Sequence, residues 1–160
     1  KAFGMKDAGF EFIDPGSGGA LSGAMGEAYN KGQGWFGYYW GPTAILGKYD
    51  MTKVDEGTAH NADTWITEIN DLNFPNPTKN KYPASTVETY VGKDMLNNEI
   101  VINYLEKRSF PNTLLSQMLA WKEENQAEAD ETAIYFLETH EDVWKNWVSA
   151  DAMSKVKASM

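Results

Sequence analysis

GWFGYYWGPT, residues 34–43, is the stretch that decides the fold expected for this chain. It places five aromatic rings in the six positions 35–40 and then breaks at Gly41-Pro42. A short aromatic run bounded by glycines is typical of a buried strand that ends in a turn. Trp40 is then expected at the end of that strand, where its ring can face a cleft.

Large rings at such a place suit a ligand with a flat face or a diffuse positive charge. A quaternary ammonium group has no N–H to donate, so hydrogen bonds cannot hold it directly. The faces of Trp and Tyr rings attract it instead, by about 0.5–2 kcal/mol per ring. The alternative is core packing, because alternate side chains of a strand covered by helices on both faces would be buried without any ligand. The residues alone leave both interpretations open for Tyr38, Tyr39 and Trp40.

The order of the remaining segments predicts an α/β domain. Residues 10–13 and 85–91 are further strand candidates, the latter because it is rich in β-branched and aromatic residues. Ser17 is a good N-cap for a helix with a stripe of apolar residues. From Asp94 onward, apolar residues recur at helical spacing, which predicts a helical C-terminal segment.

These motifs resemble the glycine betaine/choline/carnitine substrate-binding proteins of ABC importers. Trp40-Gly41-Pro42-Thr43 with Lys48-Tyr49-Asp50 is similar to the family stretch W-x-P-H … K-Y-D. Upstream, FEFI at 10–13 and GSGGAL at 16–21 are similar to the family's strand, Gly/Ser turn and helix. Downstream, residues 112–147 are similar to its C-terminal helices, and the resemblance covers most of the chain. Thr43 stands where the family usually has His, which puts the usual His contact to a ligand carboxylate in doubt.

The resemblance implies one lobe of a type II periplasmic binding protein, with the N-terminal part of the protein lacking. We expect an α/β ligand-binding core over residues 1–75, a loop and strand that cross between lobes over 76–92, and C-terminal helices over 93–160. The chain would then be an engineered piece, a proteolytic fragment or a split partner. Alone, it is expected to bind its ligand poorly, and to dimerise if it exposes an apolar patch.

The resemblance also implies which residues bind. Trp40 matches the family's ligand-contacting Trp, and Tyr38 and Tyr39 are candidates for further walls of an aromatic cage. Backbone N–H groups near Ser17 and Gly18, together with the Thr43 hydroxyl, would hold the anionic end of the ligand. For the glycines that follow Ser17, the alternative is that they only permit close packing on a sheet. A ligand without a carboxylate, such as choline, would also account for Thr43.

The implied function is the substrate-binding component of an ABC importer for quaternary-ammonium solutes. Its partners would be a small quaternary-ammonium ligand and an ABC permease, and it would be periplasmic or extracytoplasmic, membrane-associated through the transporter. The net charge of −9 argues against a nucleic-acid partner. The same charge favours solubility and adds a weak attraction for cations.

Catalytic signals are poor. GSGG at 16–19 is neither a nucleophile elbow nor a P-loop, and His140 lacks the spacing of a helical metal-ligand pair. The absence of Cys excludes disulfides and thiolate metal sites. We expect no catalytic residue, metal or cofactor. The alternatives are a small α/β hydrolase or transferase fragment that uses the Gly-Ser turn, or the same fold used only as a sensor.

Overall fold

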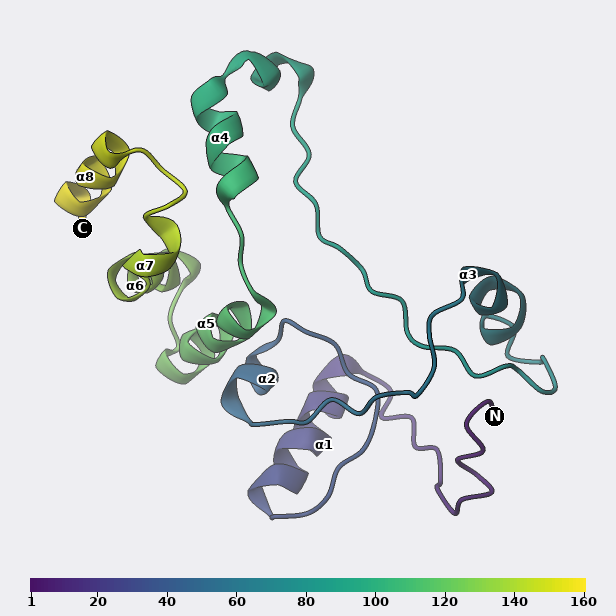
Figure 1. Ribbon diagram of the computed structural model, residues 1–160. Helices are drawn as coiled ribbons and strands as arrows, with labels where there is room; N and C mark the ends of the chain where they lie inside the picture. Colours follow the sequence, from purple (N-terminus) through teal and green to yellow (C-terminus); the bar gives the residue numbers. More distant parts are fainter. The chain divides into compact units, whose positions relative to one another are not determined.

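Helices are the only regular secondary structure of this chain, whose computed structural model describes all residues, 1–160 (Figure 1). The chain divides into two units, which are described separately. Unit 1 consists of Lys1–Leu21 and Thr52–Val87, and unit 2 consists of Ser22–Met51 and Glu88–Met160. The division expected from the sequence, at residues 75 and 92, stays a prediction.

The predicted α/β fold is wrong, because none of the three strand candidates forms a strand and no sheet is present. Residues 10–13, 34–40 and 85–91 are extended or irregular segments without a strand partner. A strand is stable only when a neighbour accepts its backbone hydrogen bonds and covers one of its faces. Val87, which the pattern placed in a sheet, is 96% exposed. For the same reason, the expected α/β lobe of a type II periplasmic binding protein is not what the structure shows.

Helix α1, Gly18–Asn30, begins where the sequence predicted. The Ser17 hydroxyl accepts a hydrogen bond from the backbone N–H of Ala20 at 3.1 Å, so Ser17 is confirmed as the N-cap. Farther along, in unit 2, Met25 is 1% exposed and Gly26 is also buried. A Cβ on Gly26 would lie 3.3 Å from the Tyr49 ring, so this face of α1 packs closely against the residue that follows α2 (Ala44–Lys48).

Unit 1 holds two short helical turns, α3 (Ala62–Thr64) and the π-helical η1 (Trp65–Ile69). Asn61 caps α3 and exchanges two hydrogen bonds with Asn80, whose side chain is buried. The Trp65 ring contacts the rings of His60 and Tyr82, with centroids 5.7 and 5.2 Å away. These contacts join two segments of unit 1 that are separated by the proline-rich loop at 73–80.

The predicted C-terminal helices are confirmed. They are η2 (Lys93–Asn97, a 3-10 turn), α4 (Glu99–Lys107), α5 (Asn112–Asn125), α6 (Ala129–Thr139), α7 (Glu141–Trp144) and α8 (Ala150–Ser159). The helix expected to start at Asp94 is interrupted, because Asn98 leaves helical geometry and caps α4 by accepting from the Val101 N–H at 3.3 Å. Glu128 and Glu131 form a reciprocal capping box at the start of α6.

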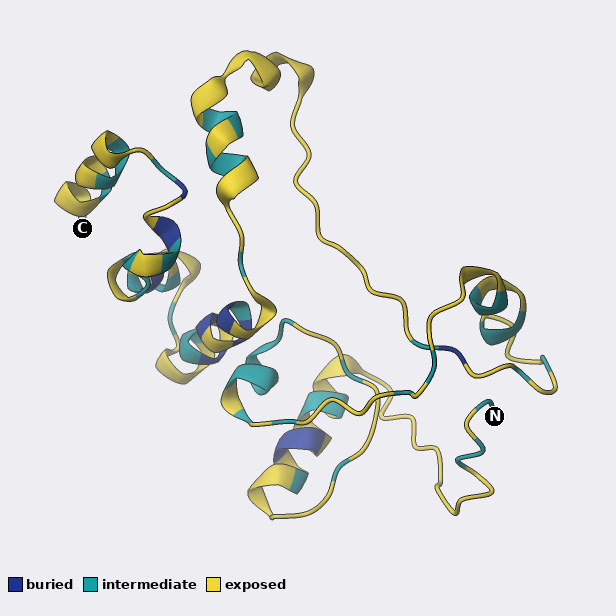
Figure 2. Cartoon of the chain, viewed as in Figure 1, coloured by how far each residue is buried: buried dark blue, intermediate teal, exposed yellow.

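A hydrophobic core lies in unit 2, where α5, α6 and α7 carry most of the buried residues (Figure 2). Its buried members are Leu114, Met118, Phe136, Trp144 and Trp147. The indole N–H of Trp144 donates to the Leu137 carbonyl at 2.8 Å, so this polar group is satisfied inside the core. The core therefore fixes α5, which is the helix that supports the ring-bearing segment described below.

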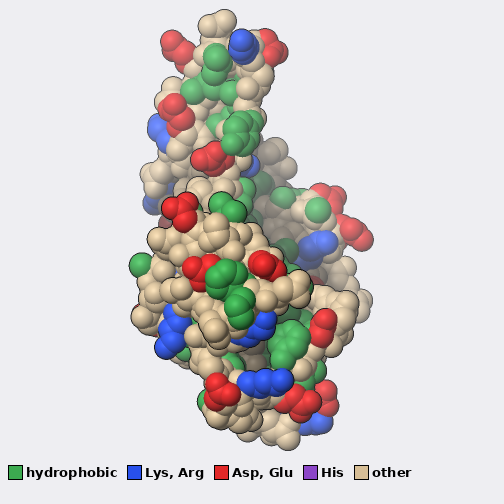
Figure 3. All heavy atoms as spheres, turned by 90° about the vertical axis from the view of Figure 1, so that its right-hand side faces the viewer, with side chains coloured by type: hydrophobic (Ala, Val, Ile, Leu, Met, Phe, Trp, Pro, Cys, Tyr) green, Lys and Arg blue, Asp and Glu red, His purple; other side chains and the backbone are tan.

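The surface carries large apolar side chains beside charged ones, as the space-filling view shows (Figure 3). Val87, Tyr90 and Ile100 are among the most exposed. None of the helices has the length and hydropathy that crossing a bilayer requires.

Candidate functional site

The ring-bearing segment of unit 2 ends at helix α2, Ala44–Lys48, which packs along α5. Gly41 and Pro42 join the rings to this helix through a cis peptide bond. A Cβ on Gly41 would lie 3.3 Å from Leu46 Cδ1, so the turn folds back against α2. The position of the rings therefore follows the position of α2 on α5.

The structure brings the three predicted ligand-binding rings together. Tyr39 and Trp40 stack, with centroids 4.7 Å apart and planes inclined by 24°. The Tyr38 ring lies 6.0 Å from Trp40 at an inclination of 33°. Trp40 is 47% exposed, so much of its surface stays open to solvent although one neighbour stacks on it. We call these three residues the ring cluster.

Thr43, the fourth predicted binding residue of this segment, lies one residue before α2. Its hydroxyl oxygen is buried and has no hydrogen-bond partner within the protein, and it does not cap the helix. A buried hydroxyl left unpaired costs free energy, of the order of 1–3 kcal/mol. The Thr43 hydroxyl therefore keeps unused hydrogen-bonding capacity, at an oxygen that solvent does not reach in this structure.

Ser17 and Gly18, the remaining predicted binding residues, belong to unit 1, whereas the ring cluster belongs to unit 2. The Ser17 hydroxyl is engaged in capping α1. The first backbone N–H groups of a helix lack intrahelical acceptors and lie at the positive end of its dipole. The turn is thus electrostatically suited to an anion, and its role stays a prediction.

Sequence reasoning missed two residues that hold this site, Ser116 and Gly47. Ser116 of α5 accepts a hydrogen bond from the Thr43 N–H at 3.2 Å and is 4% exposed. Gly47 lies against the backbone of the same residue, because a Cβ there would be 2.0 Å from the Ser116 carbonyl oxygen. A serine among the apolar residues of α5 was the available signal, yet nothing in the sequence pairs it with residues 43–47.

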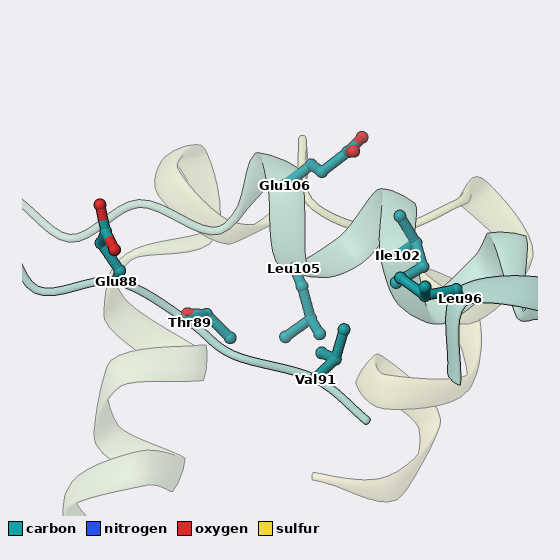
Figure 4. Close-up of a pocket in the computed structure, with 7 residues that line it drawn as sticks. All are labelled: Glu88, Thr89, Val91, Leu96, Ile102, Leu105 and Glu106. Carbon is teal, nitrogen blue, oxygen red and sulfur yellow. The ribbon is translucent and has the colours of Figure 1, made fainter. Parts of the chain in front are cut away.

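An open pocket of about 420 Å³ lies elsewhere in unit 2 (Figure 4). It is lined by Glu88, Thr89, Val91, Leu96, Ile102, Leu105 and Glu106. Figure 4 shows Leu105 reaching from α4 toward Val91 of the extended segment. None of the predicted binding residues lines it, and it contains no ring, so it is not the site that the sequence predicted.

The structure gathers no group of three or more His, Cys, Asp or Glu side chains that could hold a metal. The Ser17 hydroxyl accepts from a backbone N–H of its own helix, and both His side chains have other partners. His60 instead meets the Lys81 carbonyl, and His140 meets the Thr139 hydroxyl.

The class of protein follows from comparison with known families. Residues 1–139 match a family of substrate-binding, non-enzymatic domains that serve ABC transporters. The chain belongs to that family, which is described as the substrate binding domain of ABC-type glycine betaine transport system. The resemblance drawn from the sequence is thereby confirmed, and the hydrolase alternative is not supported. No match was found among the curated proteins.

Proposed function

We propose that unit 2 binds a quaternary-ammonium solute, of the glycine betaine, choline or carnitine type, through the ring cluster. The family accounts for a substrate-binding role in glycine betaine-type ABC transport, with a small ligand and a permease as partners. The finer assignment rests on one observation, which is the gathering of Tyr38 and Tyr39 around the half-exposed ring of Trp40.

The chemistry of the ring cluster suits a cation without N–H groups. Ring faces attract such a cation through their quadrupoles, and the attraction grows as water is removed from it. The net charge of −9 adds a weak general attraction for cations. Because the ring faces supply the attraction, a bulky, poorly hydrated ammonium group can bind without a carboxylate partner.

Thr43 is proposed to contact the polar end of the ligand. Its unpaired hydroxyl lies three residues beyond Trp40, and a hydroxyl can donate to a carboxylate or accept from an alcohol. Ser17 and Gly18 are proposed as a separate anion-contacting turn of unit 1. The protein would act outside the cytoplasm, where it would present its ligand to the permease.

The test is a titration of the chain followed by ¹⁹F NMR, with 5-fluorotryptophan at the six Trp positions. Glycine betaine, choline and carnitine are added to millimolar concentrations, so that weak binding is visible. The Trp40 resonance is assigned by its loss in Trp40→Phe. We expect its chemical shift to change with ligand concentration and to reach a plateau.

The control ligand is an uncharged analogue of choline. In 3,3-dimethyl-1-butanol a carbon replaces the nitrogen of choline, so shape is kept and charge is lost. A cation–π site binds choline more tightly than this isostere. Equal affinity for the two, or a Trp40 resonance that stays still with all three solutes, contradicts the proposal.

A further inference from the structure

One residue of α5 contacts both ends of α2. The Ser116 hydroxyl accepts from the backbone N–H of Thr43, which precedes the helix, at 3.2 Å. The Ser116 carbonyl faces Gly47, the fourth residue of α2, where a Cβ would lie only 2.0 Å away. Side-chain Cβ atoms do not approach a carbonyl oxygen so closely, so only glycine permits this contact.

These two contacts constrain α2 in different ways. The hydrogen bond fixes how far the start of the helix lies along α5, and the close approach at Gly47 fixes which face of α2 meets α5. A five-residue helix has little stability of its own, so its placement depends on such tertiary contacts. Ser116 is itself held in place, because α5 packs in the core through Leu114 and Met118.

The ring cluster is tied to the start of α2 by a short connection. Only Gly41 and Pro42 separate Trp40 from Thr43, and Gly41 packs closely against Leu46 of α2. A shift of the Thr43 backbone therefore moves Trp40. Loss of the Ser116 hydroxyl would leave the part-buried Thr43 N–H without this acceptor, which is costly, so we expect Thr43 to shift from its place on α5.

We infer that Ser116 is a positioning residue for the ring cluster: its hydroxyl sets where Trp40 and its stacked neighbour stand relative to α5. For its relevance to a ligand, this inference rests on the proposed function. The placement of the ring itself does not, because it is a property of the ligand-free protein.

The test uses the chain with 5-fluorotryptophan, each resonance being assigned by a single Trp→Phe replacement. In Ser116→Ala we expect the Trp40 resonance of the ligand-free protein to shift and broaden. The Trp65, Trp144 and Trp147 resonances should change less, because Trp65 belongs to unit 1, and Trp144 and Trp147 pack in the hydrophobic core and not in the segment that leads into α2. A Trp40 resonance unchanged in a variant with the other resonances intact overturns the inference.

Loss of stability alone must not produce the same result. Val156→Ala removes methyl groups from a residue that packs against the core cluster, and it serves as the matched destabilised control. A merely structural role for Ser116 predicts the same Trp40 resonance in both variants at matched melting temperature, and that result would overturn the inference. If Ser116→Ala does not fold, Ser116→Cys keeps the volume and weakens the acceptor, and its Trp40 resonance decides.

Glycine betaine titration then separates this inference from the proposed function. We expect Ser116→Ala to bind glycine betaine about fivefold more weakly than the unaltered chain, as the loss of one net hydrogen bond implies. If the unaltered chain does not bind glycine betaine, the proposed function fails while the ligand-free Trp40 shift still supports Ser116. If binding is normal and the Trp40 resonance does not respond to Ser116→Ala, only the positioning role fails.

Discussion

The rings of Tyr39 and Trp40, adjacent in the sequence, stack with centroids 4.7 Å apart. In a regular strand, adjacent side chains point to opposite faces, so this pair could not form there. The stacking shows that residues 38–40 collect their rings on one side. The same relationship thus excludes the expected strand and assembles the proposed cation site.

Replacing Trp40 is expected to weaken ligand binding more than it weakens the fold. In Trp40→Ala, the affinity for glycine betaine should fall by roughly 1–2 kcal/mol, about five- to thirty-fold, because the ring face is lost. Trp40 is half exposed, so the melting temperature should change little. Calorimetric titration and thermal unfolding measure the two effects. Phe36→Ala, an exposed ring of the same segment, is the control; an equal loss of affinity there contradicts a specific role for Trp40.

Thr43→Val should change selectivity. The substitution keeps the shape of the side chain and removes the unpaired hydroxyl. If that hydroxyl contacts a carboxylate, the affinity for glycine betaine should fall by a factor of about 5, while tetramethylammonium, which has no carboxylate, should bind as before. Parallel titrations with the two ligands give the ratio. Thr43 makes no ligand contact if the ratio of the two affinities is the same in Thr43→Val and in the unaltered chain, while the variant is at least as stable to unfolding.

Gly47→Ala should destabilise unit 2, because the added Cβ would lie 2.0 Å from the Ser116 carbonyl oxygen. Overpacking against backbone forces the helices apart, and we expect a loss of about 1–3 kcal/mol or more in denaturant unfolding. Gly23→Ala is the matched control, since a Cβ there meets no atom within 4 Å. It should be neutral or stabilising by about 0.5–1 kcal/mol, as alanine is the better helix former. Equal effects of the two substitutions would show that α2 does not rest on α5 at Gly47.

Ser17 variants separate helix capping from anion binding. Ser17→Ala removes the acceptor of the Ala20 N–H and should cost about 1 kcal/mol of stability. Ser17→Asp keeps a capping oxygen and adds a negative charge, so stability should be retained. If the turn contacts a ligand carboxylate, the same variant should repel glycine betaine and leave choline unaffected. If Ser17→Asp and the unaltered chain bind glycine betaine with equal affinity, Ser17 acts only as a helix cap.

The pKa of Glu27 should lie below its usual value, because Lys31, four residues on and directly after the end of α1, donates a hydrogen bond to the carboxylate and adds its charge. Because the Glu27 pKa is lower in the folded than in the unfolded chain, the ionised carboxylate stabilises the folded state at pH values above the unfolded-state pKa. This stabilisation is lost as the pH falls through the folded-state pKa. Titration of the Glu27 carboxyl by ¹³C NMR in Lys31→Met should show the pKa return toward normal. Because the pair is exposed, added salt should act in the same direction.

The sequence alone determined the local features of this protein. Ser17 was identified as a helix N-cap, the helices after residue 93 were predicted, and the motif around Trp40 was enough to indicate the family. These features depend on neighbouring residues, through capping, apolar spacing and a short recognisable motif. Such signals can be read without knowing what lies nearby in space.

The tertiary structure decided what depends on residues distant in the sequence. Whether residues 34–40 and 85–91 become strands depends on a pairing partner, and aromatic or β-branched content cannot supply one. Likewise, Ser116 lies some seventy residues from Thr43 and Gly47 in the sequence, and no sequence pattern predicts that they are in contact. The sequence thus identified residues 38–40 as candidate binding rings. Their position was decided by the packing of α2 against α5, because a short helix takes its position from the surface on which it packs.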